Sequence, residues 1–225
     1  MSLYEHPDLI QGSDAWLDAR RGIVTASVVG QLITPKTIQV AANVESRALT
    51  ATLVAERITG WTDDTYVSYD MMLGHMVEPI VRDLYGKHYA PVTEMGFMVR
   101  DDWGTRLGYS PDGLVGDDGL IEIKSRRPKE HLATILADRV PAENMAQIQC
   151  GLLVSGREWC DYVSYCGGMP LWVKRVYPDP YWQDAILEAV ETFERVAEQM
   201  VAEYQNAVIG LVITERTNYD QEMVI

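Results

Sequence analysis

An acidic and a basic side chain alternate along one short apolar stretch, residues 120–124, which reads Leu-Ile-Glu-Ile-Lys. Side chains two residues apart point to the same face of a β-strand, so Glu122 and Lys124 would lie side by side. The isoleucines between and before them would then face apolar packing. Asp112 lies in a Pro-Asp-Gly turn shortly before this stretch, and a hairpin could bring its carboxylate beside Glu122. The three side chains could therefore form one compact site.

Two carboxylates and a main-chain carbonyl would give this site a set of oxygen ligands. The carboxylates are those of Asp112 and Glu122, and the carbonyl is that of Ile123. Such hard ligands suit Mg²⁺ or Mn²⁺, which retain bound water. A metal there would make a bound water more acidic and stabilise charge on a phosphate during its transfer. Lys124 could orient that water, assist its deprotonation or stabilise the five-coordinate phosphate, and the sequence leaves these roles open.

A short Asp…Glu-x-Lys pattern also occurs on surface hairpins, where the Glu and Lys side chains point into solvent. Further blocks of sequence are needed to distinguish a catalytic site from such a hairpin. Five blocks follow one another along the chain: Gly12-Ser13-x-x-Trp16-x-x-x-Arg20-x-Gly22-Ile23-x-Thr25-Ala26-Ser27, Gly74-x-x-x-Glu78, Ser110-Pro111-Asp112-Gly113, Glu122-x-Lys124 and Met145-Ala146-Gln147-x-Gln149. In content and order they resemble the motif blocks of the phage lambda exonuclease and YqaJ-like viral recombinase family, which is part of the PD-(D/E)xK nuclease superfamily. Five ordered blocks are far more specific than any one of them.

The resemblance implies a role for several residues in these blocks. It makes Asp112 and Glu122 metal ligands and Lys124 the catalytic lysine. Glu78 would be a further carboxylate near the metals, and Gln147 would lie close to the active site. The alternatives are a solvated helix acid for Glu78 and a buried, satisfied amide for Gln147. The family's chemistry implies Mg²⁺, with Mn²⁺ as a substitute and two ions in each active site.

Three further positions match a pocket that, in the family, holds the 5′-phosphate of a DNA end: Arg20, Ser27 and Ser110. A guanidinium fork and two hydroxyl groups suit a terminal phosphate. A surface arginine and two helix-capping serines are the alternative. We expect Trp16 to be a core or motif-packing residue rather than one that stacks on bases.

The overall composition is that of an ordinary globular protein, with 47% hydrophobic and 23% charged residues among 225. This length fits a single nuclease domain over residues 1–225. The three cysteines include no C-x-x-C pair, are expected to be reduced, and are too few for the four ligands of an iron–sulfur cluster. The apolar runs are too short to cross a bilayer and the N-terminus lacks the pattern of a signal peptide, so we expect a cytoplasmic protein that does not bind membranes.

The charge balance is strongly acidic, with 33 Asp and Glu against 19 Lys and Arg, or a net charge of −14. Such a balance argues against a protein that coats nucleic acid electrostatically. It is compatible with an enzyme that neutralises phosphates with divalent ions and a few well-placed basic side chains.

Apolar periodicity and turn residues predict helices and strands in the order expected of an α/β protein. Helices are expected over residues 13–20, about 26–34, 43–58, 76–89, 128–137, 141–154 and 179–204, and strands over 96–100, 106–109, 114–115, 120–124, 158–165 and 171–177. This order indicates a mixed sheet flanked by helices. The resemblance implies that it is a PD-(D/E)xK, restriction-endonuclease-like core over about residues 12–178, followed by a packing helix over about 179–206.

Two segments are harder to interpret. Pro79 fits poorly inside a helix, so the helix should begin close to Glu78 or be kinked there. Residues 34–42 have no firm periodicity and are expected to form a mobile arm. Ile38 or Val40 in that arm are the only candidates the sequence offers for separating DNA strands, and this element stays unassigned.

The resemblance implies a Mg²⁺-dependent exonuclease that degrades one strand of double-stranded DNA from its 5′ end to mononucleotides. It also implies a ring of three subunits, a single-strand annealing protein as partner, and a phage-encoded protein that resects DNA ends for homologous recombination. Two alternatives stay open. One is another PD-(D/E)xK nuclease, either an endonuclease or a RecB-like enzyme, and the other is a catalytically silent module that binds DNA ends.

Overall fold

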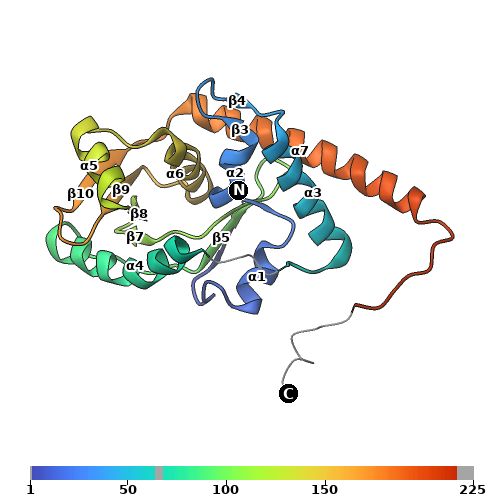
Figure 1. The fold of residues 1–225 in the computed structure, drawn as a ribbon, viewed down its shortest axis with the longest axis horizontal. Helices are drawn as coiled ribbons and strands as arrows, with labels where there is room; N and C mark the ends of the chain where they lie inside the picture. Colours follow the sequence, from blue (N-terminus) through green and yellow to red (C-terminus); the bar gives the residue numbers. More distant parts are fainter. Residues whose placement is uncertain (1, 64–67, 217–225) are drawn as a thin grey trace, which may run out of the picture.

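The structure is a computed structural model that describes residues 2–63 and 68–216. Its helices are α1 (Asp14–Arg20), α2 (Ala26–Val29), the 3₁₀ turn η1 (Gly30–Leu32), α3 (Val44–Thr59), α4 (Tyr69–His88), α5 (Pro128–Ala137), α6 (Ala142–Ser155) and α7 (Pro180–Ala207). Its strands are β1 (Leu3–His6), β2 (Val24–Thr25), β3 (Ile33–Thr34), β4 (Gln39–Val40), β5 (Phe97–Arg100), β6 (Leu107–Tyr109), β7 (Gly113–Val115), β8 (Gly119–Ser125), β9 (Trp159–Tyr165) and β10 (Trp172–Val176). Figure 1 shows their arrangement.

The expected mixed α/β architecture is confirmed, and the longer strands divide between two sheets of four strands each. One sheet has the order β10-β9-β8-β7 and the other the order β1-β5-β6-β2. In the first sheet β8 runs parallel to β9, while β7 and β10 run antiparallel to their neighbours. A parallel pair needs a long crossover connection, and helices α5 and α6 provide it.

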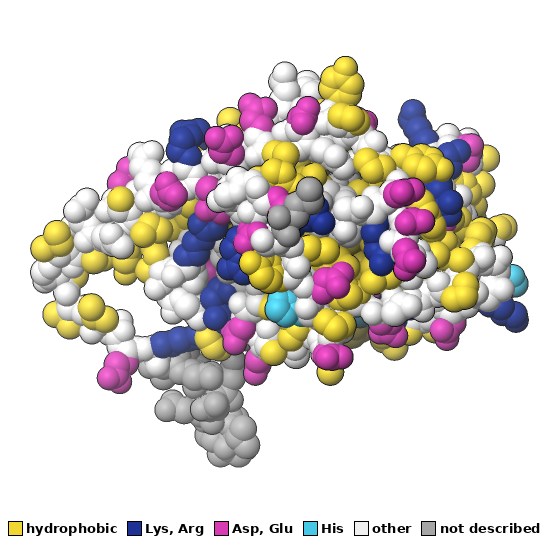
Figure 2. All heavy atoms as spheres, turned by 180° about the vertical axis from the view of Figure 1, so that it is seen from behind, with side chains coloured by type: hydrophobic (Ala, Val, Ile, Leu, Met, Phe, Trp, Pro, Cys, Tyr) yellow, Lys and Arg dark blue, Asp and Glu magenta, His cyan; other side chains and the backbone are white. Residues whose placement is uncertain are grey.

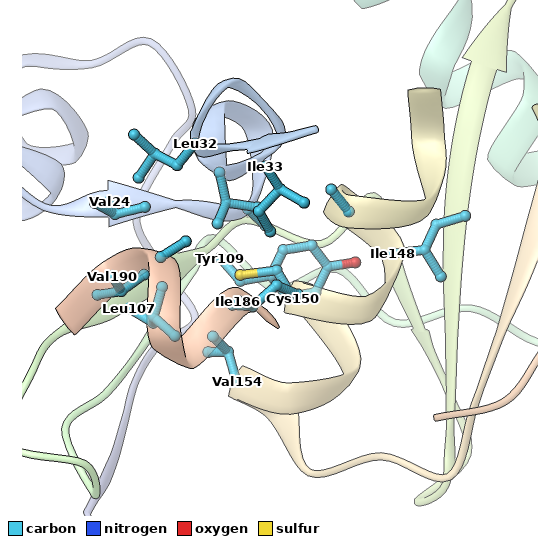
Figure 3. Close-up of a cluster of buried hydrophobic side chains, with 14 of the residues drawn as sticks. Val24, Leu32, Ile33, Leu107, Tyr109, Ile148, Cys150, Val154, Ile186 and Val190 are labelled. Carbon is cyan, nitrogen blue, oxygen red and sulfur yellow. The ribbon is translucent and has the colours of Figure 1, made fainter. Parts of the chain in front are cut away.

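The main hydrophobic core lies around α6, which packs against α2, α7, β5, β6 and β9. Figure 3 shows part of this core, where Tyr109, Cys150 and Ile186 meet between the layers. Each of these three side chains is almost completely buried. The core therefore fixes α6 beside the strands that carry the candidate site.

Helix α4 covers the opposite face of β8. Val81 and Tyr85 of α4 pack with Ile121, Ile123 and other apolar side chains of that sheet. Strand β8 is thus covered on both faces, which explains its run of apolar residues. As predicted, the two isoleucines share one face of the strand, and Glu122 and Lys124 lie on the other, toward α6.

The predicted 34–42 arm and the start of α4 differ from expectation. Residues 33–40 form a small hairpin in which β3 pairs with β4, so this segment contains two short strands although its sequence has no firm periodicity. Helix α4 begins at Tyr69 rather than near Glu78, and Pro79 lies inside it. Its first turn is capped by Ser68, whose hydroxyl accepts a hydrogen bond from the Met71 amide at 3.2 Å.

The surface mixes charges of both signs. Figure 2 shows acidic and basic side chains interspersed with apolar ones across one face of the molecule. Within the described ranges, 2–63 and 68–216, none of the helices has the length and apolar character that a membrane span requires.

Candidate active site

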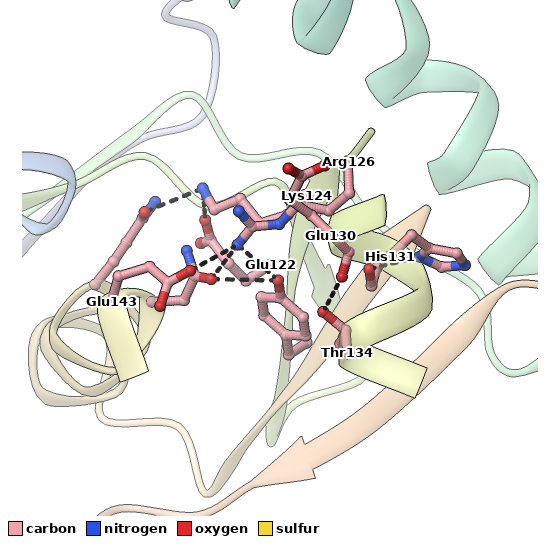
Figure 4. A network of polar contacts seen from close by, with 11 residues as sticks. Glu122, Lys124, Arg126, Glu130, His131, Thr134 and Glu143 are labelled. Atoms are coloured by element: carbon pink, nitrogen blue, oxygen red, sulfur yellow. Dashed lines mark hydrogen bonds and ion pairs between the residues drawn. The ribbon is translucent and has the colours of Figure 1, made fainter. Parts of the chain in front are cut away.

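Strand β8 and the turn before β7 bring Asp112, Glu122 and Lys124 together. The Ile123 amide on β8 donates a hydrogen bond to Asp112 Oδ2 at 2.6 Å, which fixes the turn carboxylate against the strand. Lys124 Nζ lies 2.6 Å from Glu122 Oε1 on the same face of β8. Figure 4 shows Glu122 and Lys124 pointing toward α6. The juxtaposition predicted from residue spacing is therefore present.

Burial gives the two carboxyl groups unusual acidities. Glu122 is 0% exposed. Burial, with a smaller contribution from the Asp112 charge, raises the pKa of Glu122 to about 7 against the opposing effect of Lys124. Burial likewise raises the pKa of the partly buried Asp112 to about 6, and the Glu78 charge adds to this effect. Both groups are thus held in an environment that penalises their negative charge.

Lys124 is held in its charged form. Burial alone would lower the pKa of its ammonium group, but the charges of Glu122 and Asp112 outweigh that effect and raise it. Gln147 on α6 accepts a second contact from Lys124 Nζ at 3.1 Å. Gln149 lies elsewhere, and its side-chain amide forms hydrogen bonds with the main chain at Tyr177 and Asp179. Gln147 therefore touches the candidate site and Gln149 does not.

Glu78 of α4 reaches the edge of this site but is engaged by another residue. Its Oε1 accepts a hydrogen bond from Arg82 Nη2 at 2.6 Å. Burial raises the pKa of Glu78, Arg82 opposes the rise, and the nearby Glu122 charge adds to it. Among the residues that the structure describes, no three His, Cys, Asp or Glu side chains are grouped closely enough to hold a metal. Glu78 thus lies at the edge of the site and does not form a ready-made group of three ligands with Asp112 and Glu122.

The Asp112 and Glu122 pair fits a divalent cation in charge and in ligand type. Apart from the Lys124 ammonium 2.6 Å from Oε1, the carboxylate oxygens of the fully buried Glu122 have no hydrogen-bond partner among the described residues. Buried polar atoms are rarely left in this condition, because each lost hydrogen bond is costly. A cation would satisfy these oxygens and offset the burial of two negative charges.

The three residues expected to bind a terminal phosphate lie in one connected cluster around Trp16. Arg20 Nη2 donates to Ser27 Oγ at 3.3 Å, and the Arg20 guanidinium lies 4.1 Å from the centre of the Trp16 ring. The Trp16 indole N–H donates to Ser110 Oγ at 2.9 Å. Trp16 is 7% exposed, as expected of a packing residue, and it joins Arg20 to the turn that carries Asp112.

Several residues of this region had no assigned role in the sequence. Thr25 belongs to the cluster around Trp16, since its hydroxyl accepts a hydrogen bond from Arg20 Nη2 at 3.2 Å. Beside Lys124, Arg126 donates to Tyr162 Oη at 3.0 Å and also contacts Asn144 (Figure 4). The i, i+4 spacing of Glu78 and Arg82 on a predicted helix was the one signal that could have revealed Arg82.

The chain is similar to known proteins over most of its length. The model of the YqaJ-like viral recombinase domain matches residues 15–158. No curated protein matches the chain. The fold is similar to that of an alkaline exonuclease, LHK-Exo, from Laribacter hongkongensis, with 30% identity and a TM-score of 0.78 over 89% of this chain and 100% of that one.

Two further solved structures are similar to the chain. LHK-Exo in complex with dAMP has 30% identity and a TM-score of 0.79, and again covers 89% of this chain and 100% of that one. A phage-related exonuclease from Haemophilus somnus 129PT has 13% identity and a TM-score of 0.62 over 81% of this chain and 96% of that one, a likeness of fold alone.

Proposed function

The chain belongs to the YqaJ-like viral recombinase family and is a deoxyribonuclease of the exonuclease type, and on this premise we propose that it is a metal-dependent 5′-to-3′ exonuclease acting on the ends of double-stranded DNA. One observation supports the proposal above all others. It is the contact of Lys124 with the buried Glu122, beside an Asp112 that β8 holds in place. An acid pair with a raised pKa next to a charged lysine is suited to the hydrolysis of a phosphodiester.

Asp112 and Glu122 are the proposed ligands of Mg²⁺ or Mn²⁺, with the Ile123 carbonyl as a main-chain ligand. Glu78 would contribute if a second ion is bound, since its carboxylate lies at the edge of the same site. Bound divalent ions would make a water more acidic and offset charge on the phosphate. In this proposal Lys124, held by Glu122 and Gln147, orients the attacking water or stabilises the phosphate oxygens.

Arg20, Ser27 and Ser110 are proposed to bind the 5′-phosphate. A guanidinium can form two parallel hydrogen bonds to a phosphate, and the two hydroxyl groups add further donors. In the structure the exposed Ser27 hydroxyl bonds to Arg20, and Ser110 is two residues from Asp112. A phosphate bound there would present the adjoining phosphodiester to the metal site, which would give the enzyme its 5′ polarity.

The remaining proposals concern organisation and partners. We propose a single nuclease domain, a ring of three subunits that encloses DNA, and cooperation with a single-strand annealing protein. These follow from the family and from its role in phage-type recombination. The cytoplasm of a bacterial host would be the site of action.

One assay tests the activity and its end preference together. It compares linear duplex with a 5′-phosphate, linear duplex with a 5′-hydroxyl and a sealed circle, each with and without Mg²⁺. We expect mononucleotides from the phosphorylated linear duplex, slower release from the hydroxyl form, an intact circle, and no reaction without metal. The variant Asp112→Asn should be inactive.

Other outcomes would favour the alternatives. Cutting of the sealed circle would indicate an endonuclease on the same fold. Metal binding without turnover on any duplex would indicate a silent DNA-end-binding module. Full activity of Asp112→Asn would overturn the assigned site.

A further inference from the structure

Arg82 is a largely buried arginine that joins three separate segments beside the candidate active site. It lies one turn after Glu78 on α4, and its side chain is 14% exposed. The guanidinium Nε donates to the main-chain carbonyl of Asp112 at 2.8 Å. Nη2 donates to Glu78 Oε1 at 2.6 Å, and Nη1 lies 2.9 Å from Glu94 Oε1. Each nitrogen of the planar fork therefore has its own partner.

The three contacts of Arg82 differ in how strongly they hold their partners in place. The Glu94 side chain is 77% exposed, so its ion pair with Arg82 is screened by solvent and contributes little. The contacts with Asp112 and Glu78 are shielded, and both involve proposed metal ligands. Arg82 fixes the main chain of Asp112 on one side while the Ile123 amide fixes its carboxylate on the other. The position of Asp112 thus depends on two independent hydrogen bonds.

The geometry argues against a role for Arg82 in binding DNA directly. A guanidinium that contacts a DNA phosphate must present free donors to solvent, whereas the Arg82 side chain is only 14% exposed and each of its nitrogens already has a partner. Its contact with Glu78 occupies Oε1, and a carboxylate has a second oxygen with which to bind a cation. Arg82 can therefore hold Glu78 in place without consuming its capacity as a ligand.

We propose that Arg82 is a positioning residue of the metal site, which holds the turn of Asp112 and the carboxylate of Glu78 beside the place that a divalent ion would occupy. This inference rests on the proposed function. Residues that hold ligands in place affect metal affinity by about 10- to 100-fold when they are changed. A lysine cannot replace the arginine fully, because its single ammonium group lacks the fixed fork that spans two acceptors.

The test measures Mn²⁺ binding by calorimetry in the absence of DNA, for the wild type and three variants. We expect Arg82→Gln to weaken Mn²⁺ binding by about 10- to 100-fold. Arg82→Lys keeps the positive charge but loses the planar fork, so its affinity for Mn²⁺ should lie between those of Arg82→Gln and the wild type. Glu94→Gln is the matched control, since it removes only the exposed partner of Arg82, and it should bind Mn²⁺ as the wild type does. When nuclease activity on DNA is measured, the loss of activity in Arg82→Gln should become smaller as the Mn²⁺ concentration approaches saturation.

Two results would overturn the inference. Wild-type affinity in folded Arg82→Gln would show that Arg82 does not position the ligands. Tighter binding by this variant would show that Arg82 only competes with the metal for Glu78. If Arg82→Gln fails to fold, Arg82→Lys decides the question, and wild-type affinity in that variant overturns the proposal.

The outcome can be separated from the fate of the proposed function. An inactive Asp112→Asn together with wild-type Mn²⁺ binding in the Arg82 variants would refute only the positioning role. Nuclease activity that survives in Asp112→Asn would refute the assigned site itself.

Arg157→Gln serves as a second control for the Arg82 variants. Arg157 donates hydrogen bonds to the carbonyls of Gly116 and Gly119 at the far end of the same hairpin.

Discussion

Under the proposed function single residues carry the chemistry, and the side chains whose proximity was predicted from the sequence are close to one another along the chain. Glu122 and Lys124 were found because a strand repeats every two residues, and Asp112 because a Pro-Asp-Gly turn precedes the hairpin. Arg82 was not found, because its contact with the Asp112 carbonyl spans 30 residues of sequence. Spacing along the chain reveals local pairs, but it does not reveal contacts that depend on how α4 packs on the sheet.

The buried carboxyl of Asp112 should make the metal-free protein less stable at neutral and alkaline pH. Its folded pKa of about 6 exceeds its ordinary value of 3.8, so the protonated form stabilises the fold. That stabilisation is full below pH 3.8 and is lost as pH rises through about 6. Asp112→Asn keeps an oxygen for the Ile123 amide and carries no charge. We expect it to be more stable than the wild type at pH 8, by on the order of 1–2 kcal/mol.

Thermal unfolding in a chelator, from pH 4 to pH 8, measures this effect. The advantage of Asp112→Asn should be nearly absent at pH 4, should grow as the pH rises to about 6, and should then level off. Asp117→Asn, on the exposed turn between β7 and β8, is the control and should change stability by less than about 0.5 kcal/mol. A constant difference between Asp112→Asn and the wild type across this range would contradict the assigned burial of Asp112.

Long helices and strands were predicted from the sequence, whereas several short strands were not. The long helix expected from residue 179 is present as α7, because its apolar stripe and Asp179 cap are local signals. Strand β1 was missed, because three of its four residues are exposed and only pairing with β5 defines it. The hairpin of β3 and β4 was missed for a similar reason. Its turn includes Ile38 at a φ of +51°, a conformation that nothing in an isoleucine predicts.

The link between α1 and the Asp112 turn should determine how strongly the enzyme prefers a 5′-phosphate. Trp16→Phe keeps an aromatic ring beneath Arg20 but removes the N–H that holds Ser110. One hydrogen bond contributes about 1 kcal/mol, so the ratio of kcat/KM for phosphorylated over hydroxyl ends should fall by about fivefold. The Mg²⁺ concentration for half-maximal activity should not change.

Kinetics on the two duplex forms measures this ratio. Trp103→Phe, a change of the same kind in the loop between β5 and β6, is the control and should leave the ratio as it is in the wild type. An unchanged ratio in Trp16→Phe would mean that the Ser110 contact has no part in recognising the DNA end.

The molecule as a whole repels DNA at long range, because its net charge is −14. Charges of both signs lie on the face in Figure 2, where acidic side chains surround the basic ones. We therefore expect divalent ions to contribute much of the affinity for DNA. Lys124→Ala, made to block turnover, should bind phosphorylated duplex at least about tenfold more tightly with Mg²⁺ than with a chelator.

Fluorescence anisotropy at a constant ionic strength measures this affinity, and NaCl in place of Mg²⁺ controls for screening. Equal affinity in Mg²⁺ and in chelator would show that basic side chains, rather than the metal site, anchor the DNA.

Ser110 and Asp112 are separated by a single proline, and this short rigid connection has a consequence for the products. The residues proposed to bind the end phosphate and those proposed to cut the strand cannot move apart, because the same few atoms of main chain belong to both. Under the proposed function, the fold fixes the distance between the bound terminal phosphate and the phosphodiester bond that is cut. Each cut should then release a fragment of the same length, whatever bases the strand contains.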